Sequence, residues 1–284
     1  GDLFYDPAMG DYPDIQGDQA IWWIVNDRGN THTETGGQPI GVEIHMLAFA
    51  FTTANAVNDM TFYRQTVINR STQTLNETYI GQWADADLGR FDDDYVGCDT
   101  LRGLGFCYNG DDDDDAANGY GRRPPAIGID FFQGPIADPN DGVDNDKDGT
   151  IDEADETIIM SKFVYYNNDF TLTGNPEVAQ HYYGYLSGFW KDGTPIVDNF
   201  SNGGDGSGYG AQSPGAPAAY MFPGDACTNL GWTEANANNP PFDRRFIQSA
   251  GPFTLQPGAV NEIVTGVVWA RNEAIANQFG SVRT

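Results

Sequence analysis

The residues with the clearest chemical potential form a run of regularly spaced aspartates in the middle of the chain. Loops that bind Ca²⁺ place oxygen ligands at positions one, three, five, seven, nine and twelve, with a glycine at six. Here Gly149 stands at position six. The ligand positions hold Asp144, Asp146, Asp148, the Thr150 carbonyl, Asp152 and Asp155. The spacing therefore predicts a loop that binds calcium.

The loop departs from the common pattern at its last ligand. Position twelve is Asp155, which is shorter than the usual glutamate, and the adjacent Glu156 could replace it. Ile151 occupies position eight, where an apolar anchor is usual, and the flank at 138–142 is not helical. The loop resembles those of dockerins and thrombospondin type 3 repeats more than an EF-hand sensor. We therefore expect an ion that stabilises the loop rather than a switch.

A second group of aspartates surrounds the end of a predicted strand. It comprises Asp85, Asp87, Asp92, Asp93, Asp94 and Asp99. The spacing of Asp85 and Asp87 directs both carboxylates to the same side of a strand, and residues 92–94 could complete a cage. We interpret the group as a further metal site. The alternatives are a turn with capping aspartates and a carboxylate pair for glycoside hydrolysis.

The net charge limits the function classes. The 284-residue chain has 41 acidic and 14 basic residues, a formal charge of −27, and 21 of the acidic residues lie within 85–156. Nucleic-acid binding requires a basic surface, so it is not expected. Concentrated carboxylates repel one another unless a cation lies among them, which again favours calcium. The run 111–115 is an exception, because five consecutive aspartates do not converge easily on one ion, and we interpret it as a solvated loop.

Cysteine and histidine usage gives weaker signals. Cys98 and Cys107 flank a short glycine-rich loop and are expected to form a disulfide in an oxidising compartment, which leaves Cys227 over. Zinc is not expected, because there is no CxxC motif and there are only three histidines. The histidines are scattered and no Gly-x-Ser-x-Gly elbow occurs, so the sequence leans against an enzyme without deciding the question.

Alternating and aromatic-rich stretches predict an all-β fold. Candidate strands cover residues 21–25, 41–51, 61–69, 75–83, 126–132, 161–166, 253–255 and 261–270. Residues 70–73 suit a hairpin turn between two of these strands, and 85–125 reads as an acidic loop ordered by an ion. Residues 177–187 fit either a short helix or an aromatic turn, and 273–279 has helical composition.

These elements predict one elaborated β-sandwich domain over residues 1–284, with acidic calcium-binding insertions at 85–125 and 138–156. No apolar run of about 20 residues occurs, so direct membrane insertion is not expected. The composition at the C-terminal end suggests that the domain is a fragment of a longer chain.

Several short motifs occur in an order that resembles a known region. They are 61–63 (TFY), 67–71 (VINRS), 81–89 (GQWADADLG), 92–99 (DDDYVGCD), 108–110 (YNG), 221–225 (MFPGD), 243–246 (DRRF) and 251–258 (GPFTLQPG). From about residue 40 onward the chain resembles an extracellular region of large proteins exported by the type IX secretion pathway of Gram-negative bacteria. The resemblance implies contact with that secretion machinery, a secreted or cell-surface location, and a C-terminal sorting domain elsewhere in the polypeptide.

The combined expectation is a secreted calcium-binding module for structure or adhesion. Its expected partners are other extracellular protein subunits or surface glycans. The rivals are a carbohydrate-active hydrolase and a carbohydrate-binding module, the latter built on the aromatic stretch 182–190. Packing in the core is the alternative explanation for those aromatics.

Overall fold

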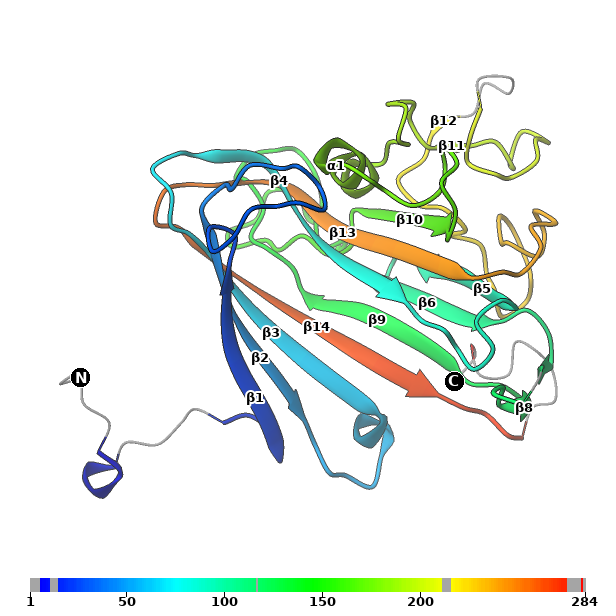
Figure 1. Cartoon of the computed structure of the whole chain (residues 1–284), viewed down its shortest axis with the longest axis horizontal. Helices are drawn as coiled ribbons and strands as arrows, with labels where there is room; N and C mark the ends of the chain where they lie inside the picture. The colour runs from blue at the N-terminus through cyan, green and yellow to red at the C-terminus, as the bar shows by residue number, and fades with distance from the viewer. Residues whose placement is uncertain (1–5, 11–14, 116, 211–215, 275–281, 283–284) are drawn as a thin grey trace.

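Strand-forming stretches assemble into two packed antiparallel sheets, as Figure 1 shows for the computed structural model. The structure describes residues 6–10, 15–115, 117–210, 216–274 and 282. Seven strands form the larger sheet in the order β1-β2-β3-β14-β9-β6-β5, and three strands form the smaller one in the order β10-β13-β4. The expected all-β sandwich is confirmed. The predicted helical segment 273–279 lies mostly outside the described residues.

The elements have the following bounds. The larger sheet contains β1 (Gln19–Asn26), β2 (Val42–Ala50), β3 (Met60–Asn69), β5 (Asp94–Asp99), β6 (Leu104–Asn109), β9 (Ala126–Gln133) and β14 (Val260–Ala270). The smaller sheet contains β4 (Leu75–Asp85), β10 (Lys162–Asn167) and β13 (Arg244–Leu255). Short elements are β7 (Asp113–Asp114), β8 (Gly121–Arg122), β11 (Val197–Asp198), β12 (Ala216–Pro217), α1 (Ala179–Ser187), η1 (Pro7–Met9) and η2 (Ala56–Asp59).

The core lies between the two sheets and is rich in aromatic rings. Phe163 of β10 and Phe246 of β13 are fully buried with ring centroids 5.2 Å apart. Opposite them stands Gly105 of β6, where a Cβ would come within 3.0 Å of both rings. The absence of a side chain at this position therefore allows the sheets to approach closely.

The predicted hairpin at residues 70–73 is wrong. β3 pairs with β2 and β14, whereas β4 pairs with β13 in the other sheet. The link therefore carries the chain from one sheet to the other. Asn69 holds this corner, because its amide donates to the carbonyls of Gln73 at 2.8 Å and Leu255 at 2.9 Å.

The acidic segment 85–125 contains strands that its composition conceals. β5 and β6 form a hairpin at the edge of the larger sheet, and the Val96 and Tyr108 side chains are almost fully buried. Tertiary packing thus overrides the weak local pattern of a segment rich in glycine and aspartate. The interpretation of the whole segment as a loop is wrong.

The expected disulfide between Cys98 and Cys107 is also wrong. Both side chains are buried thiols. In the β5–β6 register, Cys98 lies opposite Gly105 and Cys107 lies opposite Val96. The two cysteines are therefore diagonal neighbours, which are about 7–8 Å apart in an antiparallel pair. A disulfide requires a closer approach of the two Cα atoms.

The aromatic stretch near residue 182 forms α1 and the turn after it, packed on the smaller sheet (Figure 1). Tyr185 and Trp190 are fully buried and meet edge to face at 5.8 Å. Tyr182 and Tyr183 remain partly exposed. Of the two interpretations for 177–187, the helix is therefore correct, and its aromatics divide between the core and the surface.

Candidate metal centres

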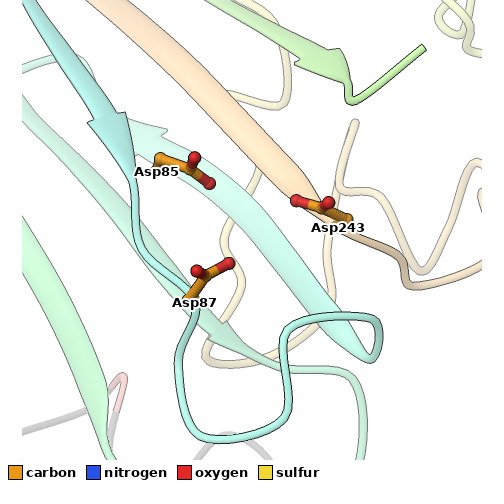
Figure 2. A group of neighbouring side chains, drawn as sticks. All are labelled: Asp85, Asp87 and Asp243. Carbon is orange, nitrogen blue, oxygen red and sulfur yellow. The ribbon is translucent and has the colours of Figure 1, made fainter.

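The first candidate centre lies where β4 ends beside the start of β13. Asp85 is the last residue of β4, Asp87 follows in the next loop, and Asp243 immediately precedes β13. One carboxylate oxygen from each residue lies within 4.8 Å of the others. Figure 2 shows the three carboxyl groups facing a common space. The sequence predicted Asp85 and Asp87 together but missed Asp243.

The charges at this centre are only partly compensated. Arg245 is paired with Asp85 at 2.8 Å and with Asp243 at 2.8 Å. Burial raises the pKa of Asp85; Arg245 lowers it, while the charges of Asp87 and Asp243 raise it further. The Oδ1 atom of Asp85 is buried without a hydrogen-bond donor. A cation between the three carboxylates would satisfy this atom and relieve the repulsion.

A buried ion pair fixes the position of Asp243. The neighbouring Arg244 is fully buried and its guanidinium lies 2.7 Å from the Glu234 carboxylate, which is also fully buried. Glu234 further accepts hydrogen bonds from the Val96 backbone N–H at 2.6 Å and from the Asn239 amide at 2.7 Å. The start of β13 is thereby tied to β5 and to the loop before it, and Asp243 is held opposite the end of β4.

The second candidate centre is the predicted calcium loop. The structure forms two groups of carboxylates there, Asp144 with Asp146 and Glu156, and Asp146 with Asp148 and Glu153. Asp146 belongs to both groups, so the loop offers adjacent positions for cations. Three of the predicted ligands are thus brought together with two glutamates.

Local hydrogen bonds explain how the aspartates reach this arrangement. The backbone N–H groups of Gly149 and Thr150 donate to Asp144 and Asp148 at 3.0 and 2.8 Å. The other carboxylate oxygen of Asp144, Oδ1, is buried without a donor. The Gly149 φ of 101° lies in a region that favours glycine.

The loop is attached to the sandwich through a lysine rather than an apolar residue. The Lys147 ammonium donates to the Thr100 carbonyl at 2.5 Å and to the Tyr220 hydroxyl at 2.9 Å, and it lies 4.8 Å from the Tyr220 ring centroid. Ile151 is 57% exposed, so the expectation that it anchors the loop is wrong. Lys147 therefore attaches the acidic loop to the sandwich, although both of its neighbours in sequence are aspartates.

The end of the loop departs from the predicted ligand order. Asp152 and Asp155 are exposed with φ near +60° and belong to neither group. Asp152 instead accepts the Gly142 N–H at 2.9 Å. Glu156 is 6% exposed and takes the place of Asp155, which is the substitution that the sequence had left open.

The other predicted aspartates between 92 and 99 do not join Asp85. Asp92 is paired with Arg90, and Asp99 is paired with Arg102. Asp94 is 1% exposed; its Oδ2 accepts the Leu88 N–H at 3.1 Å, and its Oδ1 has no donor.

The region around Asp94 contains further acidic groups. Asp93 also has a buried carboxylate oxygen without a donor. Asp114, in the run expected to be solvated, is 1% exposed and accepts the N–H groups of Arg90 and Tyr120. The solvated-loop interpretation is therefore wrong for Asp114, while Asp111, Asp113 and Asp115 are exposed.

The chemistry that both centres support is the binding of a hard divalent cation. Each group presents three carboxylates, and oxygen-only ligand sets suit cations of this kind. Neither centre includes a histidine or a cysteine.

No family model matches the chain, and no curated protein matches it. In the described residues, no helix has the length and apolar character needed to cross a membrane.

The buried Asp94 carboxyl gives a testable pH dependence. Burial is the main reason that its pKa rises to about 8. Between the unfolded value near 4 and about 8, the folded protein keeps a proton that the unfolded chain has released, so stability falls as pH rises. Asp94→Asn is expected to remove this fall and to stabilise the protein by about 2–5 kcal/mol at pH 9, with no gain below pH 4.

Urea unfolding across this pH range measures the effect. Asn retains an oxygen that can accept the Leu88 N–H, and the exposed Asp113→Asn is the control for loss of one negative charge. Equal pH profiles for Asp94→Asn and the unsubstituted protein would contradict this assignment.

Proposed function

We propose that the chain is a calcium-binding structural or adhesive module of an extracellular or cell-surface bacterial protein. The observation that carries the proposal is the pairing of acidic clusters with buried carboxylate oxygens that lack a hydrogen-bond donor. Asp85 and Asp144 each have one such oxygen, and the two residues belong to different groups. A buried charge without a partner is costly, and a bound cation offsets that cost.

Calcium is the favoured cation because of the ligand chemistry and the loop spacing. Ca²⁺ accepts six to eight oxygens in flexible geometry, whereas Mg²⁺ requires a tighter octahedral set. The spacing of Asp144, Asp146 and Asp148, with Gly149 after them, fits a calcium loop. The second centre lies on a loop, and the first joins the end of β4 to the loop that follows and to the residue before β13. The role proposed for the ion is therefore to hold these loops against the sandwich.

The proposal also includes an extracellular or cell-surface location. The sequence resemblance to type IX secretion cargo supports export through that machinery to the cell surface or medium. Extracellular calcium concentrations suit sites of modest affinity. Other extracellular protein subunits and surface glycans are the proposed partners.

Removal of calcium is expected to destabilise the protein. Saturation of one site at a hundredfold excess over Kd contributes about 2.7 kcal/mol, which corresponds to roughly 5–10 °C in Tm for a chain of this size. Calorimetric melting with calcium and with excess chelator measures this shift. An unchanged Tm would contradict the proposal.

Substitutions in the acidic loop test whether calcium stabilises the protein through this site. Asp146→Ala with Asp148→Ala should remove most of the contribution of the loop, because Asp146 belongs to both of its groups. Asp111→Ala with Asp113→Ala removes the same charge from exposed positions and is the matched control. If the two double variants melt alike in calcium, the loop is not the stabilising site.

A cleft on the outer face of the smaller sheet favours carbohydrate binding as a second candidate function. The cleft has a volume of about 640 Å³. Its lining includes Trp83 and Arg245 of the sheet, Tyr182 of α1, and Phe170. Trp83 is 56% exposed, and its indole N–H donates to the Tyr166 hydroxyl at 2.6 Å, which orients the ring.

The charge of the cleft suits a neutral ligand. Arg245 is already paired with two aspartates, and Glu34 adds an acidic group to the lining. Aromatic faces contact the apolar faces of sugar rings, while carboxylate and amide groups bond to hydroxyls. A neutral saccharide therefore fits better than an anionic one.

Trp83→Ala is expected to weaken binding of a neutral polysaccharide by about 10- to 100-fold, because it removes the largest aromatic ring of the cleft lining. Affinity electrophoresis in gels that contain soluble neutral polysaccharides measures the change. Trp269→Ala, on the other sheet and 37% exposed, is the control. Equal migration of wild type and Trp83→Ala in every gel would reject the cleft as a sugar site.

A further inference from the structure

The first candidate centre and the cleft on the smaller sheet share a side chain. Arg245 lines the cleft, and its guanidinium lies 2.8 Å from Asp85 and 2.8 Å from Asp243 of the centre. The Arg245 side chain is 14% exposed, and the two ion pairs hold it in place. The cleft therefore borders the centre directly.

Strand register explains why the centre and the cleft are adjacent. Asp85 of β4 stands opposite Arg245 of β13, which stands opposite Tyr166 of β10. Opposite residues of antiparallel strands share a face of the sheet, and so do residues two apart along one strand. Trp83 therefore lies on this face as well, and its indole N–H donates to the Tyr166 hydroxyl at 2.6 Å. Three side chains of the cleft lining thus lie on the same face as Asp85.

A second connection runs from the centre to the loop at 168–176, which follows β10. The Asn168 amide donates to Oδ2 of Asp243 at 3.1 Å. Oδ1 of Asn168 in turn accepts the amide of Asn175 at 2.8 Å. Asn175 and two other residues of this loop line the cleft. The position of this wall of the cleft therefore depends on the position of Asp243.

The charges of the centre make both connections sensitive to a cation. Its three carboxylates, shown in Figure 2, share one guanidinium, which leaves a formal charge of −2 that one divalent cation neutralises. Arg245 uses Oδ2 of Asp85, and Oδ1 is the buried oxygen without a donor. Without a cation the carboxylates repel one another. Any displacement of Asp85 or Asp243 then moves Arg245 or the loop with it.

We propose that a calcium ion at Asp85, Asp87 and Asp243 controls the shape of the cleft and thereby its affinity for a neutral saccharide. This inference rests on the proposed calcium binding and gives the first centre a regulatory role in addition to a structural one. Arg245 and Asn168 are positioning residues between the ion and the cleft. Because coupling between two sites is reciprocal, a ligand in the cleft also tightens calcium binding by the same factor.

Hydrogen exchange of the loop at 168–176 tests the coupling with calcium alone as the probe. Calcium is expected to slow exchange of its backbone amides at least about fivefold relative to excess chelator, which is the lower end of typical coupling between sites. Asp87→Asn removes one charge from the centre but none from the cleft lining, and asparagine tolerates the φ of 38° at this position. This variant should need at least about tenfold more calcium for the same protection.

Two further variants separate this local effect from general stabilisation by calcium. Asp146→Ala with Asp148→Ala removes ligands of the other centre and should keep the calcium-dependent protection of the loop at 168–176. Asn168→Ala breaks the connection to Asn175 at an exposed residue. It should bind calcium as tightly as wild type and lose most of the protection. Exposed Asp113→Asn is the charge control for Asp87→Asn.

Calcium titrations by calorimetry distinguish failure of the coupling from failure of the calcium site. Equal isotherms for wild type and Asp87→Asn would remove calcium from the first centre, and the coupling would be overturned with it. A weaker isotherm for Asp87→Asn, with equal exchange of the loop in calcium and in chelator, would overturn the coupling alone. Protection lost equally in Asp87→Asn and in the Asp146→Ala with Asp148→Ala variant would also overturn it, because general stabilisation would then explain the effect.

The coupling also predicts how a bound saccharide responds to calcium. A soluble neutral polysaccharide that retards the wild-type protein in a gel should bind at least about fivefold more weakly in chelator than in calcium. The comparison is made below the Tm of the calcium-free protein, so that both forms are folded. Equal affinity in calcium and in chelator would overturn the proposal.

Discussion

The folded chain depends on a solution to the mutual repulsion of its carboxylates. Folding places Asp85 and Asp87 within 4.8 Å of Asp243, which is far along the chain, and gathers five acidic residues in the loop at 144–156. With 41 acidic residues against 14 basic ones, the protein has too few cationic side chains to compensate these clusters. Divalent cations compensate such clusters at a few points with oxygen ligands, and both candidate centres lie where the chain turns between elements.

Two basic side chains, Arg244 and Lys147, attach one part of the fold to another and do not neutralise the acidic surface. Arg244 is fully buried with Glu234 and ties β13 to β5. Lys147 fastens the acidic loop to Thr100 and Tyr220. Removing one partner of a buried ion pair leaves an uncompensated charge, which is typically very destabilising. These two side chains therefore determine where the acidic loops lie, and the cations proposed at the loops complete the arrangement.

The sequence predicted the features that depend on residues close together in the chain. Alternation located most strands, and the spacing of Asp144, Asp146 and Asp148 located the loop, because its ligands are close in sequence. Asp243 could not be found in this way, since its place beside Asp85 follows from the pairing of β13 with β4. The β5–β6 hairpin was missed because Gly97 and Gly105 weaken the strand signal, although a Cβ at either would clash with a phenylalanine ring. A short polar link is compatible with both a hairpin and a crossing between sheets, so the local pattern at 70–73 could not predict that β3 and β4 lie in different sheets.

The unequal size of the two sheets links the fold to its proposed role. The smaller sheet carries the aromatic cleft, and the larger sheet extends to β1, whose apolar edge is exposed. The central claim is that calcium occupies the acidic clusters, and anomalous diffraction from crystals grown in calcium tests it most directly. We predict anomalous peaks among Asp85, Asp87 and Asp243 and within the Asp144–Glu156 loop, each surrounded by carboxylate oxygens at about 2.3–2.6 Å. Well-ordered loops without a peak at either cluster would contradict the account.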